Sequence, residues 1–315
     1  MNLIDLNPYT QKTLFGYDNF FLKIANLYKQ NKLPNKILLS GPNGIGKATF
    51  AYHLINFIFS QNEEFNYDIG NYTINDLNHS YRLIKKNSHP NFFLIDLVDD
   101  KKTIEISQVR KMINYANKSA LNNKERIILI DNVENLNVNS SNALLKIIEE
   151  PNDNVFFILI LDSNKKILET VKSRCLKFNL SLSFNECINI VNKITNFKIE
   201  ETVNFDLINH YCTVGDFINL INFSLSSNVD INSLDLKNFL LNLIENKYYK
   251  KDIYVKKNIY KFSEFYLYKL MNIHRSSKKI TNISQNLIKR IYYLNKFNLD
   301  DESFFIELKS KVLNG

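Results

Sequence analysis

Residues 41–48 read Gly-Pro-Asn-Gly-Ile-Gly-Lys-Ala and fit the phosphate-binding pattern G-x-x-x-x-G-K-[ST] except at the last position. In this pattern the glycines let backbone N–H groups approach phosphate oxygens, and the helix that follows adds partial positive charge at its N-terminus. The lysine would neutralise the β and γ phosphates of a bound nucleotide. We therefore predict a nucleotide-binding loop built from Gly41, Asn43, Gly44, Gly46 and Lys47.

Ala48 stands where the pattern needs a hydroxyl. That hydroxyl normally ligates the Mg²⁺ ion that bridges the β and γ phosphates. Thr49 is a candidate nucleotide-binding residue, but one step along a helix turns a side chain by about 100°, so it replaces the missing ligand poorly. We expect ATP to bind weakly at most, Mg²⁺ to bind only together with nucleotide, and no metal site of the chain's own.

An acidic residue follows a second apolar segment. Ile127-Ile128-Leu129-Ile130 predicts a buried strand that delivers Asp131 at its carboxyl end, where the carboxylate could hold Mg²⁺ directly or through water. A carboxylate at this position could also cap a helix. The next residue is Asn132, whose amide cannot act as a general base, and Glu134 would need a different geometry. Both observations argue against efficient hydrolysis by this chain.

A parallel sheet would bring these residues together. Segments with strand and helix patterns alternate along the first part of the chain, and 60–88 is polar and predicted to be irregular. The predicted strands are 36–40, 92–96, 126–131 and 155–161, and the predicted helices are 18–31, 49–59, 106–113 and 140–150, the last stopped by Pro151. Such alternation predicts an α/β domain whose parallel sheet is covered on both faces.

Strand signals stop after about residue 180, and the rest of the chain has a helical pattern. We therefore expect three domains. They comprise residues 1–180, an α/β nucleotide-binding domain, residues 181–235, a small helical domain, and residues 236–315, a second helical domain.

Composition limits the classes of function. The chain has 315 residues, a net charge of +8 and three scattered cysteines, which suit a reducing compartment and match no zinc ligand spacing. No stretch of 18 apolar residues predicts a membrane span, and the N-terminus lacks the pattern of a signal peptide. The basic balance is compatible with nucleic-acid contact, and a lysine-rich solvated surface explains it equally well.

Two further segments suggest a family. A helix that ends in Glu149-Glu150-Pro151 follows Asp131, and Ser173-Arg174-Cys175 comes later. A P-loop, a helix ending in Glu-Glu-Pro and a Ser-Arg-Cys motif in this order resemble the clamp loader subunits of bacteria and eukaryotes, which are AAA+ proteins. Leu33-Pro34-Asn35 and 44–49 are most similar to the delta-prime family of bacterial DNA polymerase III. The resemblance covers roughly residues 15–180 and the remainder only by length and layout.

The resemblance implies an AAA+ P-loop domain, a helical lid and a C-terminal collar within a ring of five subunits that loads a sliding clamp onto primed DNA. It implies as partners gamma/tau-like and delta-like subunits, the sliding clamp and primer–template DNA, with no membrane, in a bacterial cytoplasm and at the nucleoid during replication. Many family members carry a four-cysteine zinc module after the P-loop, but 60–126 contains no cysteine, so we expect no zinc. Ser163 and Asn164 occupy the position of a polar nucleotide sensor.

Arg174 has a specific role in such a ring. The resemblance implies that it reaches the ATP site of a neighbouring subunit, where a guanidinium would bind the γ-phosphate and stabilise charge in the transition state. An ordinary surface ion pair is the alternative for this arginine. Motor subunits carry Glu where this chain has Asn132, and a sensor arginine where it has Asp216, whose charge would repel phosphate.

The favoured hypothesis is therefore a delta-prime-like subunit that does not hydrolyse ATP efficiently and supplies Arg174 in trans. The alternative is an active clamp loader ATPase or another AAA+ motor. A third hypothesis is a stand-alone DNA-binding module that uses the basic surface, which predicts salt-sensitive DNA binding by the isolated chain.

Overall fold

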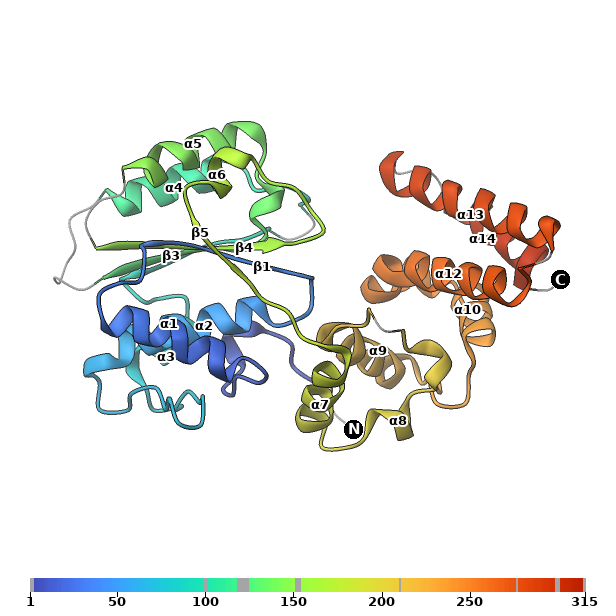
Figure 1. Cartoon of the computed structure of the whole chain (residues 1–315), viewed down its shortest axis with the longest axis horizontal. Helices are drawn as coiled ribbons and strands as arrows, with labels where there is room; N and C mark the ends of the chain where they lie inside the picture. The colour runs from blue at the N-terminus through green and yellow to red at the C-terminus, as the bar shows by residue number, and fades with distance from the viewer. Residues whose placement is uncertain are drawn as a thin grey trace. The chain divides into compact units, whose positions relative to one another are not determined.

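The computed structural model describes residues 3–98, 101–117, 125–150, 154–209, 211–275, 277–297 and 301–313. The chain divides into two compact units (Figure 1). The first, called the sheet unit here, comprises Asp5–Ile190 and Thr213–Gly215. The second, called the helical unit, comprises Met1–Ile4, Val191–Cys212 and Asp216–Gly315. The finer division into domains at 180 and 235 stays a prediction.

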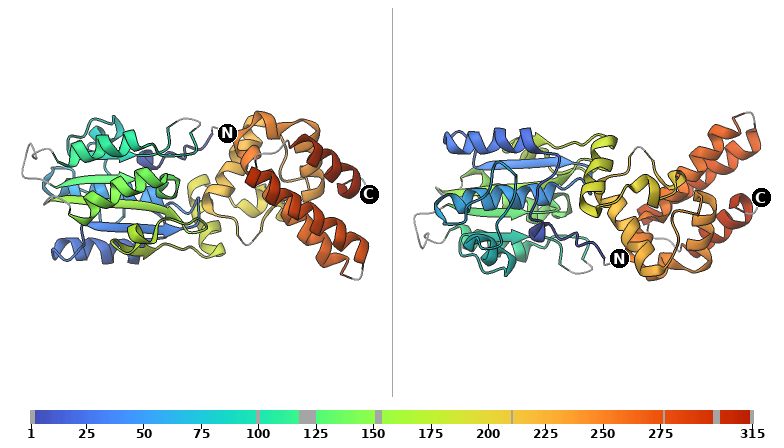
Figure 2. Two further views of the ribbon diagram at one scale, coloured as in Figure 1. Left: turned by 90° about the horizontal axis from the view of Figure 1, so that it is seen from above. Right: turned by 90° about the horizontal axis from the view of Figure 1, so that it is seen from below.

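The sheet unit is built on a five-stranded sheet in the order β2-β3-β4-β1-β5, in which all neighbouring strands are parallel (Figures 1 and 2). The strands are β1 (Lys36–Gly41), β2 (Phe92–Ile95), β3 (Arg126–Ile130), β4 (Val155–Asp162) and β5 (Leu176–Asn179). Strand β1 is hydrogen-bonded on both sides, to β4 and to β5, so the loop that follows it starts from the interior of the sheet.

Helices cover both faces of this sheet, with α1, α2 and α3 on one side and α4, α5 and α6 on the other (Figure 1). They span α1 (Asp18–Lys29), α2 (Lys47–Phe59), α3 (His79–Lys85), α4 (Ile106–Ala116), α5 (Val138–Glu149) and α6 (Glu169–Lys172). Side chains alternate along a strand, so Ile37 and Leu39 of β1 join the hydrophobic cluster under α1 and α2, while Leu38 joins the cluster under α4 and α5. The predicted α/β class, with a parallel sheet covered by helices on both faces and followed by further helices, is confirmed.

Two elements of the sheet unit differ from the sequence prediction. Strand β5 was not predicted, because it has only four residues at the edge of the sheet and all four remain exposed or half-buried. Helix α3 lies within 60–88, which was predicted to be irregular, and Asn78 caps it by accepting a hydrogen bond from the Tyr81 backbone N–H. Pro151, predicted to end α5, lies outside the described residues.

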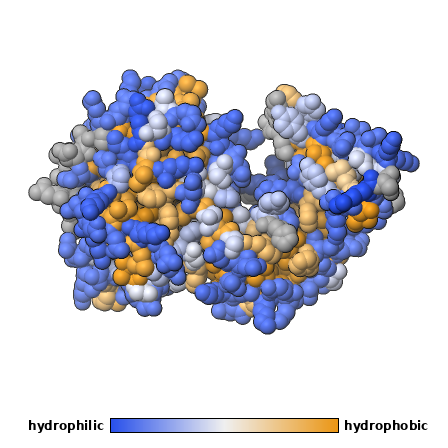
Figure 3. Space-filling model, viewed as in Figure 1, coloured by the Kyte–Doolittle hydropathy of each residue, from blue (hydrophilic) through white to orange (hydrophobic). Residues whose placement is uncertain are grey.

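The helical unit continues from α7 (Phe184–Thr195), in which the sheet unit ends. Its further helices are α8 (Ile199–Thr202), α9 (Val214–Ser227), α10 (Leu236–Glu245), α11 (Tyr248–Lys251), α12 (Ile253–Ile273), α13 (Lys278–Phe297) and α14 (Glu302–Leu308). Fully buried aromatic side chains, among them Phe217, Phe239 and Phe304, form its core. On the face of the molecule drawn in Figure 3, most of the surface is hydrophilic, and apolar residues are exposed in patches.

Phe50 of α2 lies at the centre of the packing beneath the P-loop. Its side chain is 0% exposed and its ring contacts those of Tyr17, Phe20 and Phe21. We expect Phe50→Ala to lower the free energy of unfolding of the sheet unit by about 3–5 kcal/mol, because it removes a ring that the surroundings cannot refill. Urea unfolding followed by circular dichroism measures this loss.

A matched control is Val138→Ala at the start of α5, where the parent side chain is 67% exposed. That change should alter the unfolding free energy by less than about 0.5 kcal/mol. Equal effects of the two substitutions would contradict the packing described.

Candidate functional site

The carboxyl ends of the central strands gather most of the predicted site residues. Gly41 at the end of β1 is paired with Asp162 of β4, and the Ser163 backbone N–H donates to the Gly41 carbonyl at 3.0 Å. Asp131 follows β3 directly, and its N–H donates to the carbonyl of Ile95 in β2. The structure thus brings the P-loop, Asp131 and the 163–164 turn to one edge of the sheet.

The P-loop has the backbone that its glycines permit. Gly44 has φ +81° and Gly46 has φ +88°, a left-handed region in which a side chain would be strained. Gly46 is also the N-cap residue of α2, so the loop passes directly into the helix. The hydroxyl of Tyr17, the residue just before α1, donates to the Ile45 carbonyl at 2.7 Å and so ties the P-loop to the start of that helix. Asn43 at the loop's outer turn is exposed.

The side chain of Lys47 folds back onto the P-loop and bonds its backbone. Its ammonium donates to the Pro42 carbonyl at 2.7 Å, and the residue is only 7% exposed. Burial lowers the pKa of this lysine, while the nearby carboxylates of Asp162 and Asp131 act in the opposite direction. A bound phosphate would have to replace the Pro42 carbonyl as the partner of the ammonium.

The segment Thr213–Gly215 lies against the P-loop. The Gly215 N–H donates to the Gly44 carbonyl at 2.8 Å, and a Cβ added at Gly215 would come within 2.9 Å of the Gly44 Cα. A Cβ added at Gly44 would come within 2.4 Å of the Thr213 hydroxyl oxygen. This contact was not predicted from the sequence, and it requires glycine on both sides.

The position after Lys47 makes no polar contribution. Ala48 packs its methyl group against the core cluster under α1 and α2, and Thr49 is half-buried one position further along α2. Asp216, singled out in the sequence as the replacement for a sensor arginine, belongs to the helical unit, where the Lys261 ammonium lies 3.9 Å from its carboxylate.

Asp131, Asp96 and Asn132 interact at the carboxyl edge of the sheet. Burial, and then the charge of Asp96, raise the pKa of Asp131 to about 6. Asn132 has a left-handed backbone, φ 54°, and its side-chain amide donates to Asp96 Oδ1 at 2.8 Å. The Asn132 amide is therefore engaged with a neighbouring carboxylate.

The carboxylate of Glu134, the nearest one after Asp131 in the sequence, already has hydrogen-bond partners. Its side chain is 3% exposed and accepts from the Asp162 backbone N–H at 3.2 Å and from the Lys165 ammonium at 3.3 Å. The Asn164 N–H in the same turn donates to Asp162 Oδ1 at 3.0 Å. These bonds hold Glu134 against the turn after β4.

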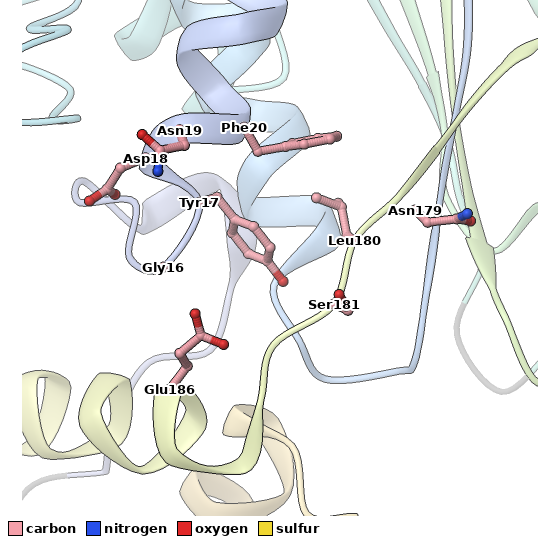
Figure 4. Close-up of a pocket in the computed structure, with 9 residues that line it drawn as sticks. All are labelled: Gly16, Tyr17, Asp18, Asn19, Phe20, Asn179, Leu180, Ser181 and Glu186. Carbon is pink, nitrogen blue, oxygen red and sulfur yellow. The ribbon is translucent and has the colours of Figure 1, made fainter.

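A pocket of about 390 Å³ borders this edge (Figure 4). Its walls come from the start of α1, with Tyr17 and Phe20, and from the chain after β5, with Leu180 and Ser181, while Glu186 lies at its rim. Because the Tyr17 hydroxyl bonds the P-loop, the pocket and the loop share a wall. This pocket was not predicted from the sequence, since its residues come from segments far apart in the chain.

Arg174 is separated from all these residues. It lies in the turn before β5, whose first residue, Leu176, pairs with Ile37 near the start of β1. The P-loop leaves the other end of β1, four residues and about 13 Å of extended strand away. Since the strands are parallel, Arg174 lies at the amino edge of the sheet and the predicted nucleotide-binding residues at the carboxyl edge.

The neighbours of Arg174 are well defined. Its guanidinium pairs with Glu149 Oε1 at 2.7 Å and donates to the Thr170 carbonyl at 2.9 Å, and its side chain is 36% exposed. Burial raises the pKa of the adjacent Cys175 thiol to about 11, so this cysteine is an unreactive part of the core.

Two further findings concern membrane spans and metal sites. Across the described parts of the chain, no helix combines the length and the apolar character needed to cross a membrane. Within those same ranges, histidine, cysteine and acidic residues form no group of three or more that could hold a metal ion.

Known proteins similar to this chain include several DNA polymerase III subunits. Residues 17–183 match the family described as DNA polymerase III, delta subunit. The chain is 31% identical over 140 residues to DNA polymerase III subunit delta' of Pseudomonas aeruginosa, covering 44% of this chain and 41% of that protein. It is 29% identical over 239 residues to DNA polymerase III subunit gamma of Buchnera aphidicola, covering 73% of this chain and 62% of that protein. The chain thus spans less than two thirds of the length of these relatives.

A solved structure of a DNA polymerase III gamma subunit-related protein from Thermotoga maritima aligns with 91% of this chain and 96% of its own, at 10% identity and a TM-score of 0.46. A RuvB structure from the same organism aligns with 85% of this chain and 81% of its own, at 14% identity and a TM-score of 0.44.

The raised pKa of Asp131 yields a pH-dependent prediction. A carboxyl whose pKa is raised on folding holds its proton more tightly in the folded chain, so its ionisation destabilises the fold as the pH rises from about 4 to about 6. We expect Asp131→Asn to gain stability relative to the parent across this range, by about 2–3 kcal/mol above pH 6. Urea unfolding at several pH values measures the difference.

Asp96→Asn is the companion variant, because the Asp96 charge is the second cause of the shift. It should move the pH-dependent change in stability to lower pH while Asp131 is retained. A stability difference between parent and Asp131→Asn that is the same at pH 4 and pH 8 would contradict the account.

Proposed function

The chain belongs to the DNA polymerase III delta subunit family, and we propose that it acts as a delta-prime-like clamp loader subunit that lends Arg174 to a neighbouring ATPase. In this role it would help to load a sliding clamp onto primed DNA without efficient ATP hydrolysis of its own. Its partners would be gamma/tau-like and delta-like subunits, the clamp and primer–template DNA, in the cytoplasm of a bacterium.

The observation that carries this proposal is the separation of Arg174 from the chain's own P-loop. A guanidinium stabilises the transferred phosphoryl group only when it reaches the γ-phosphate directly. Arg174 lies at the amino edge of the sheet, whereas the P-loop lies at the carboxyl edge. An arginine so placed is unsuited to its own nucleotide and suited to one held by another subunit.

Among the residues that the structure describes, the carboxyl edge of the sheet lacks the groups that efficient ATP hydrolysis needs. Ala48 offers no ligand for Mg²⁺, the Asn132 amide bonds Asp96, and Glu134 is held by the turn after β4. Lys47 and the loop backbone remain as groups that could bind phosphate. We therefore propose that this edge binds ATP weakly at most, with Mg²⁺ only alongside nucleotide, and serves mainly as a structural element.

Arg174→Ala in the reconstituted clamp loader tests the proposal. Loss of a guanidinium supplied in trans should slow hydrolysis at the one site it serves by about 10³-fold, while the assembled complex keeps its mass. ATP turnover and the mass of the complex are measured on the same sample.

Lys172→Ala is the matched control, since it removes a cation two positions earlier that pairs with the exposed Glu169. This control should leave turnover unchanged. An Arg174→Ala complex that assembles and hydrolyses ATP at the parent rate rules out the role in trans.

The second candidate, an active AAA+ motor, is favoured by the nearness of Lys47 to the Asp131 carboxylate. Ala48→Ser restores the missing hydroxyl and distinguishes the two. We expect no rise in ATP hydrolysis by the isolated variant, because neither Asn132 nor Glu134 is free to activate water. A rise of tenfold or more would favour the motor.

A further inference from the structure

The ion pair between Arg174 and Glu149 joins two segments that the sequence presents as separate motifs. Glu149 is the last residue of α5, and Arg174 follows α6. The Arg174 terminal nitrogen Nη2 lies 2.7 Å from Glu149 Oε1. The other terminal nitrogen, Nη1, donates to the Thr170 carbonyl at 2.9 Å. The guanidinium is therefore held from two directions, by a carboxylate and by a backbone carbonyl.

Within the described parts of the chain, these two contacts leave most N–H donors of the guanidinium unused. An arginine carries five N–H donors in a fixed plane, and this pair of contacts uses one on each terminal nitrogen. Toward the described residues, the other three N–H groups make no hydrogen bond, and the side chain is 36% exposed, so it is accessible from solvent. The arrangement orients the guanidinium while preserving enough donors for a bidentate contact with a phosphate.

Both supports are anchored in the core. Ile148, next to Glu149, is 0% exposed, and Val171, next to Thr170, is 2% exposed. Both belong to the hydrophobic cluster under α4 and α5, together with Cys175, which follows Arg174. A partner that is fixed by packing restricts an arginine better than one on a mobile loop.

The pair is too exposed to contribute much to stability. The Glu149 side chain is 48% exposed, and ion pairs at such positions contribute little to folding because water screens them. An arginine side chain has large rotamer entropy, however, and restricting it before assembly lowers the entropy lost when it meets a phosphate. The benefit of the pair therefore lies in orientation.

We propose that Glu149 is the positioning residue for Arg174, holding the guanidinium in the orientation in which it reaches the nucleotide of a neighbouring subunit. This inference rests on the proposed function of Arg174 in trans. Glu149 touches no nucleotide in this role and acts only through the arginine.

The test is Glu149→Gln in the reconstituted clamp loader, with ATP as the probe. We expect kcat for ATP hydrolysis to fall about two- to fivefold with KM for ATP unchanged, as expected for the loss of an interaction of up to about 1 kcal/mol. In the isolated chain, ¹⁵N relaxation of the Arg174 Nε–H should show larger motion in the variant than in the parent. A role in folding alone would move neither quantity.

Glu150→Gln is the matched control, because it makes the same change of charge one residue later, at another exposed side chain. It should leave kcat and the Arg174 motion unchanged. The double variant Glu149→Gln, Arg174→Ala should hydrolyse ATP no more slowly than Arg174→Ala alone, since Glu149 acts through the arginine.

Three results would overturn the inference. They are an unchanged Arg174 motion in Glu149→Gln, a rise in kcat when Glu149 is neutralised, and an effect of Glu149→Gln that persists without Arg174. Failure of the proposed function is distinguishable, because Arg174→Ala would then leave ATP turnover unchanged, while the relaxation measurement would still report whether Glu149 restrains the arginine.

Discussion

The pairing of β1 with strands on both of its sides is the constraint on which the rest of the structure depends. Because β4, β1 and β5 run parallel, everything that follows these strands gathers at one edge of the sheet, and everything that precedes them lies at the other. The P-loop follows β1, and Arg174 precedes β5. One hydrogen-bonding pattern thus fixes both the residues that could bind the chain's own nucleotide and the distance of Arg174 from them.

The P-loop retains its shape through contacts within the chain. Its left-handed glycines are needed for the turn, and Gly44 is needed a second time for the close approach of Gly215. Lys47 bonds the Pro42 carbonyl, and Tyr17 bonds the Ile45 carbonyl. These bonds are all made within the chain, so groups of the protein itself hold the shape of the loop.

The sequence was sufficient for the features that local patterns encode. Continuous apolar runs identified β1, β3 and β4, and the P-loop was recognisable from its glycines and lysine. Strand β5 escaped prediction because it depends on pairing with β1, and α3 because its segment is polar and its cap, Asn78, is not followed by an apolar run. The contact of Gly215 with Gly44 and the engagement of Glu134 by the β4 turn arise from long-range packing, which no local pattern reveals.

The central claim is that this chain contributes an arginine to a neighbour and does not itself act as a motor. The most direct test measures ATP turnover by the purified chain alone with excess Mg²⁺. The same chain in the reconstituted complex serves as the reference. The account predicts no hydrolysis above background for the isolated chain and steady hydrolysis by the complex. Turnover by the isolated chain at rates ordinary for AAA+ motors would contradict it.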